Sequence, residues 1–135
     1  GGNLRGKPAL IVHGRSDALI AVNHTSRAYF GLNQKVEGSD SRLSYIEVSN
    51  AHHLDVLNGF YPTATIPLHV YLVRALNAVY ATLKSGVALP PSQVVHTSTR
   101  ATAAETLVAA KLPPLSNTPG ADAIIFSGST VQIPQ

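Results

Sequence analysis

The sequence predicts an α/β fold built from parallel strands and crossover helices. Two segments, residues 8–12 and 43–48, have the β-branched and aromatic composition of buried strands. Each is followed by a segment of helical character, the first capped by Asn23 and the second starting at Pro67. Because such crossovers are right-handed, we expect both strands to lie parallel in one sheet.

The first strand, Pro-Ala-Leu-Ile-Val at residues 8–12, is apolar throughout and is closed by His13 and Gly14, which is typical of a central strand. A polar turn at residues 15–17 follows. Asn23 can then cap a helix. The side chains expected to face inward in this helix are Ala28, Tyr29 and Leu32, before Gly31 and Asn33 weaken it.

The second strand, residues 43–48, ends at Ser49 and Asn50 in a loop that holds His52 and His53. From Pro67, apolar residues recur at helical spacing, and Gly86 supplies the stop. These apolar positions are Leu68, Tyr71, Leu72, Ala75, Leu76, Val79 and Leu83. We expect Tyr71 and Tyr80 to pack on the buried side of this helix or at its margin.

The composition changes after Gly86, where proline pairs at 90–91 and 113–114 divide the chain into short pieces. We expect one helix at residues 101–110. Residues 123–126 and 130–133 are expected to pair as short strands across a Ser-Gly-Ser turn. The sequence therefore predicts a main unit, residues 1–88, and a Pro-rich extension, residues 89–135, that packs on it.

The composition excludes several classes of protein. With 135 residues, of which 44% are hydrophobic, the chain fits one globular domain, and its start without Met suggests a fragment of a longer polypeptide. The net charge is +3, but its Lys and Arg residues are spread evenly, which argues against a nucleic-acid partner. No apolar run approaches the roughly 18 residues of a membrane span. The absence of Cys excludes a disulfide framework and a thiolate metal site.

Candidate chemistry lies in the loops that follow the two strands. Asp17 and His53 each come a few residues after a strand, and the carboxyl ends of parallel strands meet at one edge of a sheet. A carboxylate beside an imidazole fixes its tautomer and stabilises the imidazolium form. An acid followed by His is also the order of the α/β-hydrolase triad. Alone, however, such an Asp is more often a turn residue, and such a His a solvated side chain.

Other arrangements carry less chemistry. Asp55 can replace Asp17 as the partner of His53, but at two residues' distance its side chain is better placed to fix the loop. His13 at a strand end is more often a packed, hydrogen-bonded side chain than a catalyst. None of the six His residues has the spacing of a metal site, so we expect no metal and no cofactor.

Several segments resemble the D-(-)-3-hydroxybutyrate oligomer hydrolases. The first, residues 2–19, reads Gly-Asn-Leu-Arg-Gly-Lys-Pro-Ala-Leu-Ile-Val-His-Gly-Arg-Ser-Asp-Ala-Leu and is shared in looser form by many α/β-hydrolases. The string Leu-Pro-Pro-Ser-Gln-Val-Val at residues 89–95 is the narrower marker. The resemblance continues through the His52-His53 loop and the helix from Pro67 to the closing Val-Gln-Ile-Pro-Gln.

The resemblance implies the C-terminal portion of an α/β-hydrolase fold that cleaves ester bonds in short (R)-3-hydroxybutyrate oligomers. It implies Asp17 as the acid and His53 as the base of a Ser-Asp-His triad, and a secreted or periplasmic location. No Gly-x-Ser-x-Gly motif occurs here, so the serine is expected from the remainder of the hydrolase chain. Another carboxylesterase, a peptidase and a non-catalytic binding or structural fragment remain alternatives, and the motif alone favours His53 over His52 as the base.

Overall fold

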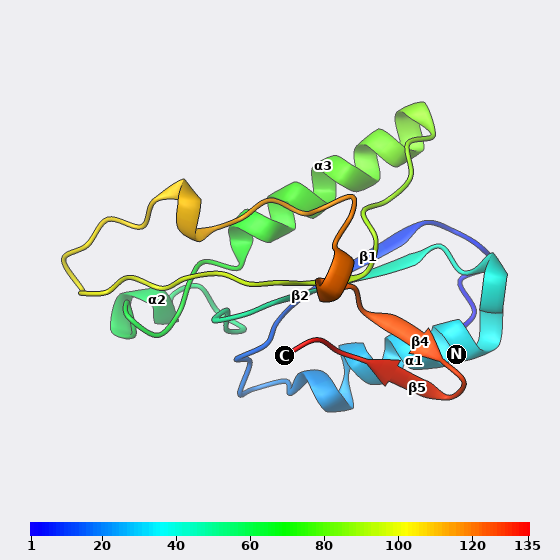
Figure 1. Cartoon of the computed structure of the whole chain (residues 1–135), viewed down its shortest axis with the longest axis horizontal. Helices are drawn as coiled ribbons and strands as arrows, with labels where there is room; N and C mark the ends of the chain where they lie inside the picture. The colour runs from blue at the N-terminus through cyan, green and yellow to red at the C-terminus, as the bar shows by residue number, and fades with distance from the viewer.

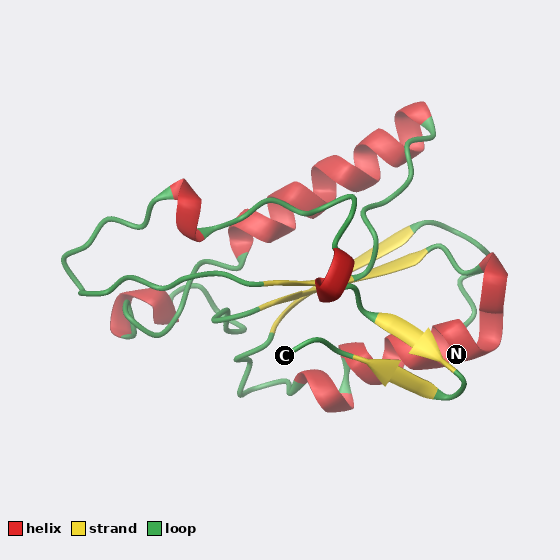
Figure 2. Cartoon of the chain, viewed as in Figure 1, coloured by secondary structure: helices red, strands yellow, loops and turns green.

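The computed structural model describes residues 1–135 and forms a small α/β domain with a three-stranded parallel sheet and a separate two-stranded antiparallel ribbon (Figures 1 and 2). The parallel sheet has the order β1-β2-β3, with bounds β1 Ala9–Gly14, β2 Leu43–Val48 and β3 Gln93–Val95. The two expected strands are therefore confirmed as parallel neighbours. The register pairs Ala9 with Leu43 and Gly14 with Val48, so the strands end level at their carboxyl ends.

The central strand β2 is buried at all six positions because helices lie on both faces of the sheet. Alternate side chains of β2 enter two different cores, as the two-residue period of a strand requires. Ile46 and Val48 pack with Tyr71 of α3 (His69–Ser85), whereas Leu43 and Tyr45 pack with Phe30 of α1 (Ser26–Glu37). The sheet is thus the middle layer between α1 and α3.

Helix α1 begins later than expected and turns a different side to the sheet. Asn23 lies in a short 3-10 helix, Val22–His24, and its side chain accepts a hydrogen bond from Arg27 instead of capping the helix. The expected inward position of Leu32 is wrong, because its side chain is 45% exposed. Phe30 and Asn33 face inward instead, and Phe30 stacks in a tilted arrangement on Tyr45. The expectation for Ala28 is also wrong, since it is exposed.

The helix expected from Pro67 is confirmed as α3, and it ends at Gly86 in the left-handed conformation. Tyr71 is fully buried and donates its hydroxyl hydrogen to the Pro113 carbonyl at 3.0 Å. The expectation for Tyr80 is wrong, because this residue is 63% exposed. The apolar pattern of α3 covers two adjacent faces, and the sheet buries only one. The exposed face, called the α3 outer stripe below, consists of Leu72, Leu76, Tyr80 and Leu83.

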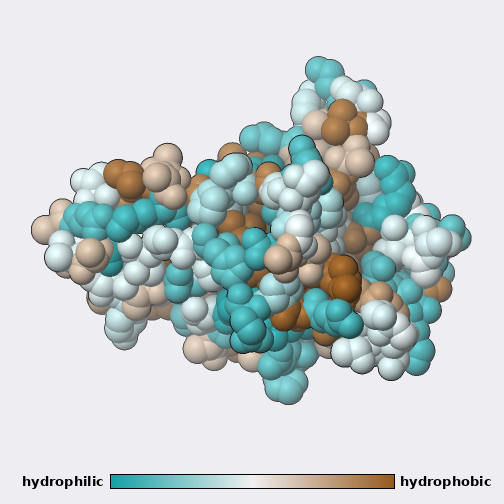
Figure 3. Space-filling view, in the orientation of Figure 1, coloured by the Kyte–Doolittle hydropathy of each residue, from teal (hydrophilic) through white to brown (hydrophobic).

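Short elements connect these units. A 3-10 turn (Gly38–Asp40) follows α1, and a four-residue helix α2 (Leu57–Phe60) lies in the connection between β2 and α3. No helix is long and apolar enough to cross a membrane. Figure 3 shows apolar side chains at the far end of α3 and near the middle of this face, among hydrophilic and intermediate ones.

The Pro-rich extension, residues 89–135 and called the tail below, differs from expectation in one element and agrees in another. The helix expected at residues 101–110 is wrong: the segment forms bends and turns before a 3-10 turn at Ala109–Lys111. Its many Thr and Ala residues have no apolar face to bury, so nothing stabilises a helix there. The expected strand pair is confirmed as β4 (Ile125–Ser127) and β5 (Thr130–Gln132), antiparallel around Gly128 with a φ of 63°.

The tail also contributes to the parallel sheet. Strand β3 lies after residue 88, yet it pairs with the carboxyl half of β2, Ile46 opposite Gln93. A second 3-10 turn (Gly120–Asp122) then leads to Ile124, whose N–H donates to the Ser92 carbonyl at 2.9 Å. Residues on both sides of position 88 therefore share one sheet, and the division of the chain at that position stays a prediction.

Candidate active site

Two loops meet at the carboxyl ends of β1 and β2. The loop after β1 is fastened by backbone hydrogen bonds to the end of β2, from Arg15 N–H to the Val48 carbonyl at 2.7 Å, and to the loop that follows β2, from Ser16 N–H to the Ala51 carbonyl at 3.0 Å. The first loop holds Asp17 and the second holds His53. Because the strands are in register, the bases of both loops start at the same level of the sheet.

The structure brings Asp17 and His53 together. Asp17 Oδ2 lies 2.9 Å from His53 Nδ1, although 36 positions separate the two residues in the chain. The Asp17 side chain is 0% exposed, and that of His53 is 39% exposed. The other carboxylate oxygen, Oδ1, accepts the backbone N–H groups of Leu19 and Ile20, each at 2.9 Å. The carboxylate is thus fixed from both sides and turned toward an accessible imidazole.

These hydrogen bonds determine the ionisation of Asp17. Burial raises the pKa of its carboxyl, but the hydrogen bonds from Ile20, His53, Leu19 and His13 outweigh burial and lower the pKa to about 2. Asp17 is therefore an anion at neutral pH and can only accept hydrogen bonds. It follows that Nδ1 of His53 carries the hydrogen when the ring is neutral, and that Nε2 keeps its lone pair. Nε2 has no hydrogen-bond partner within the chain.

The neighbouring candidates have different contacts. His52 forms no hydrogen bond with Asp17; its Nδ1 accepts the backbone N–H of His53 at 2.8 Å, and its Nε2 lies 3.4 Å from the backbone N of Ala18 in the Asp17 loop. Asp55 accepts the N–H groups of Leu68 and His69 at 2.7 and 2.9 Å, at the start of α3. Asp55 therefore fixes the loop, as expected from the sequence, and forms no hydrogen bond with His53.

A cavity of about 330 Å³ opens beside His53 on the α3 side of the sheet. Its lining is largely apolar, so it can hold a short aliphatic group next to the His53 side chain. The residues that line it are Val12, His53, Leu54, Asp55, Leu68, His69 and Leu72.

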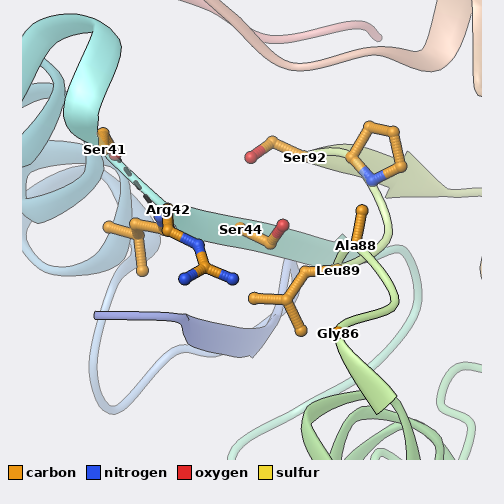
Figure 4. Close-up of a pocket in the computed structure, with 9 residues that line it drawn as sticks. Ser41, Arg42, Ser44, Gly86, Ala88, Leu89 and Ser92 are labelled. Carbon is orange, nitrogen blue, oxygen red and sulfur yellow. Dashed lines mark hydrogen bonds between the residues drawn. The ribbon is translucent and has the colours of Figure 1, made fainter. Parts of the chain in front are cut away.

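A second cavity, of about 350 Å³, lies at the opposite, amino end of β2 (Figure 4). The three serine hydroxyls in its lining are engaged in hydrogen bonds: Ser41 donates to Asn33 Oδ1 at 2.6 Å, Ser44 donates to the Pro90 carbonyl at 2.5 Å, and Ser92 accepts the N–H of Tyr45 at 2.9 Å. Arg42, the cation in its lining, forms no ion pair. This cavity lies away from the acid and the imidazole, which follow the other ends of the strands.

A buried charge cluster supports the Asp17 loop, and the sequence analysis missed it. Glu47 of β2 is fully buried and accepts hydrogen bonds from Arg15 Nε at 2.5 Å, Arg27 Nε at 2.8 Å and the Tyr45 hydroxyl at 2.7 Å. Burial raises the pKa of Glu47, but Arg27, Tyr45 and Arg15 outweigh it and lower the pKa below its usual value. The signal in the sequence was a Tyr and a Glu two positions apart in an otherwise buried strand.

The cluster also joins the loop to the tail. Arg15 lies two positions before Asp17, and its Nη2 donates to the Pro134 carbonyl at 2.8 Å. The base of the Asp17 loop is therefore held by β2 on one side and by the end of the tail on the other.

Gly14 allows the close approach of the two loops. A Cβ atom at this position would lie 2.3 Å from the carbonyl oxygen of Ala51, a distance at which the backbone must move. We therefore expect Gly14→Ala to lower the free energy of unfolding by about 3 kcal/mol, because backbone atoms cannot yield as a flexible side chain can. Urea unfolding of the full-length protein would measure this loss.

The matched control is Gly59→Ala. Nothing lies within 4 Å of a Cβ at Gly59, which is inside α2, so we expect a change smaller than about 1 kcal/mol there. Equal stability of the two variants would show that the loops can separate at Ala51 without cost.

The fold and the site define the chain as a small α/β domain that holds a buried carboxylate against an accessible imidazole at the carboxyl edge of its sheet. Residues 1–135 match the family model described as 3HB-oligomer hydrolase. The chain belongs to this family, and the resemblance noted in its sequence is confirmed.

Individual relatives give the same result. The chain is 54% identical to the D-(-)-3-hydroxybutyrate oligomer hydrolase of Cupriavidus pinatubonensis and 53% identical to that of Cupriavidus necator, in each case over 98% of the chain and 20% of the relative. It is 55% identical to the protein of the same name from Ralstonia pickettii, over 98% of the chain and 19% of that relative. The chain thus spans about one fifth of the length of these relatives. No solved structure matches the chain.

Proposed function

We propose that this chain supplies the acid and the base for hydrolysis of ester bonds in (R)-3-hydroxybutyrate oligomers, as the C-terminal part of an α/β-hydrolase-type catalytic domain. The observation that carries the proposal is the 2.9 Å contact between Asp17 Oδ2 and His53 Nδ1, which leaves Nε2 of an accessible ring without a partner beside an apolar cavity. In a Ser-Asp-His triad the acid likewise accepts the hydrogen bond from Nδ1 of the imidazole, and the serine nucleophile lies at Nε2.

The chemistry follows from these positions. A serine hydroxyl adds to the ester carbonyl carbon while its proton passes to Nε2 of His53, and Asp17 stabilises the imidazolium that forms. When the tetrahedral intermediate collapses, the carbon–oxygen ester bond breaks and His53 returns the proton to the leaving alkoxide. Water then attacks the acyl-enzyme carbonyl carbon and loses a proton to His53. The bond between the acyl carbon and the serine oxygen breaks, His53 returns the proton to that oxygen, and 3-hydroxybutyric acid leaves.

The serine in this scheme comes from another part of a longer protein. No serine of the chain is hydrogen-bonded to His53, and the buried Ser26 contacts His13 instead. The length of the relatives leaves ample sequence for a nucleophile and its oxyanion donors. The substrate class rests on the names of the relatives and is consistent with the apolar cavity, which has the size for a short aliphatic acyl group.

A comparison of substrates tests the proposal in the full-length protein. We expect turnover of 3-hydroxybutyrate dimer and trimer and no cleavage of a peptide, because the cavity beside His53 is apolar and the relatives act on hydroxybutyrate oligomers. Release of monomer, followed by chromatography, measures the activity, with a p-nitrophenyl ester as the reference substrate.

Two other results would redirect the assignment. Turnover of the p-nitrophenyl ester without the oligomers would indicate a different carboxylesterase, and cleavage of the peptide would indicate a peptidase. Oligomer binding without cleavage of any substrate would indicate a non-catalytic binding protein. The family resemblance also leads us to propose a secreted or periplasmic location, which fractionation of cells that produce the full-length protein would test.

A further inference from the structure

We infer that His13 is a positioning residue that shares the Asp17 carboxylate with His53 and thereby sets how strongly His53 holds its proton. The inference rests on the proposed function, because it assumes that His53 is the base. It starts from a contact that a triad does not require. Asp17 Oδ2 accepts hydrogen bonds from two imidazoles, His53 Nδ1 at 2.9 Å and His13 Nε2 at 3.0 Å.

The carboxylate has no acceptor site left over. Oδ1 takes the N–H groups of Leu19 and Ile20, and Oδ2 takes the two imidazoles, which together use the four lone-pair positions of a carboxylate. Negative charge on Oδ2 that is drawn toward His13 is therefore unavailable to His53. The two rings compete for one oxygen.

The tautomer of His13 follows from the same carboxylate. Because the Asp17 anion only accepts, Nε2 of His13 must carry a hydrogen, and Nδ1 of the neutral ring is left to accept. Ser26 Oγ lies 2.6 Å from this Nδ1, so the serine hydroxyl donates to it. Ser26 is buried and is the first residue of α1, so the helix fixes the orientation of the His13 ring.

The burial of the two rings separates their roles. The His13 side chain is 11% exposed, and both of its nitrogens are occupied, so it has no free atom to offer a substrate. His53, in contrast, lines the cavity, and its Nε2 has no hydrogen-bond partner in the chain. His13 thus acts through Asp17 and does not touch the reacting atoms.

Other titratable groups surround these residues, and the test leaves all of them in place. Beside His13, Glu47 is the register partner on β2, and its charge is paired with Arg15 and Arg27. On the cavity side of His53, the titratable neighbours on its own loop and on α3 are His52, Asp55 and His69.

The test is the pH dependence of kcat/KM in the full-length protein, with a hydroxybutyrate dimer as substrate. His13→Leu removes one donor from Oδ2, which then faces His53 with more of its negative charge. We expect the midpoint of the acid limb to move to higher pH by about half a unit to one unit, because a carboxylate oxygen with one donor fewer stabilises the imidazolium form of His53 more strongly. We also expect kcat to fall about tenfold, with KM within about twofold, because the carboxylate is less firmly held.

Three further variants complete the series. In His13→Gln the side-chain amide donates a hydrogen bond toward Oδ2, so we expect the midpoint to return close to that of the parent protein. In Ser26→Ala the His13 ring loses its second anchor, and we expect a shift in the same direction as in His13→Leu but smaller. His24→Gln, an exposed His outside this cluster, should change neither the midpoint nor kcat.

A midpoint in His13→Leu that stays in place or moves to lower pH would overturn the inference, even if kcat falls, because a purely structural role lowers activity without moving the limb. If His13→Leu fails to fold, an unmoved midpoint in Ser26→Ala has the same consequence. Asp17→Asn and His53→Ala in the same assay separate this from a failure of the proposed function. Full activity in these two variants would contradict the proposed function. If both variants are inactive and the pH midpoint of kcat/KM is unchanged in the His13 variants, only the role of His13 is contradicted.

Discussion

Replacing His53 with Ala in the full-length protein is expected to lower kcat for hydroxybutyrate oligomers by about five orders of magnitude, because the serine would lose the group that takes its proton. Asp17→Asn is expected to cost somewhat less, about three to four orders of magnitude, since a misoriented imidazole keeps some basicity. Steady-state release of monomer from the trimer measures both effects.

His52→Ala is the matched control for this prediction. His52 is the adjacent residue in the same loop and forms no hydrogen bond with Asp17, so we expect its loss to change kcat by less than about tenfold. Loss of activity in His52→Ala together with an active His53→Ala would show that His52 is the base. Full activity in an Asp17→Asn, His53→Ala double variant would exclude both residues.

The second large effect is expected from residues 1–135 expressed alone. We expect no ester hydrolysis above background, because no activated serine is present, and we expect the isolated chain to aggregate or to require a partner. The α3 outer stripe leaves Leu72, Leu76 and Leu83 between 45% and 70% exposed. Strand β1 is at the edge of the sheet, and its apolar sequence lacks the charges that normally protect an edge.

Light scattering after size-exclusion chromatography measures this association. A variant with Leu76→Glu and Leu83→Lys on the stripe should be less aggregated than the parent chain, and Lys35→Glu on the exposed side of α1 is a charge-changing control that should have no such effect. A parent chain that is monomeric and melts cooperatively would contradict the prediction, and the stripe would then be an ordinary surface.

The strands, α3, the terminal hairpin and the closeness of Asp17 to His53 could be predicted because each depends on a local pattern or on a general rule for parallel sheets. Apolar runs mark buried strands, and their carboxyl ends converge at one edge. The Asp17 loop and the His53 loop therefore had to meet once β1 and β2 were known to be neighbours.

The missed features depend on contacts between distant residues. The inward side of α1 is decided by the packing of Phe30 on Tyr45 and by Asn33, which donates to the Gly2 carbonyl at 2.7 Å. Neither contact can be predicted from the spacing of apolar residues in the helix. The hydrogen bonds of His13 and His53 to the same Asp17 carboxylate likewise could not be predicted from a local pattern. The sequence suggested that His13 is hydrogen-bonded but not to which group. The prediction of a helix at 101–110 is wrong because it rested on local helix propensity alone, which no tertiary contact supports.

The adjacency of β1 and β2 has a consequence for how the site forms. The two strands that carry the acid and the imidazole, from the first residue of β1 to His53, lie in one continuous stretch with α1 as its only long crossover. Closing a loop of this size has a modest entropic cost, and strands paired across a single helix form contacts of moderate sequence separation. During biosynthesis, the acid and the base can therefore be brought to the same edge of the sheet when β2 docks on β1, and the contacts of Asp55 with α3 and of Arg15 with Pro134 are added as the rest of the chain emerges from the ribosome.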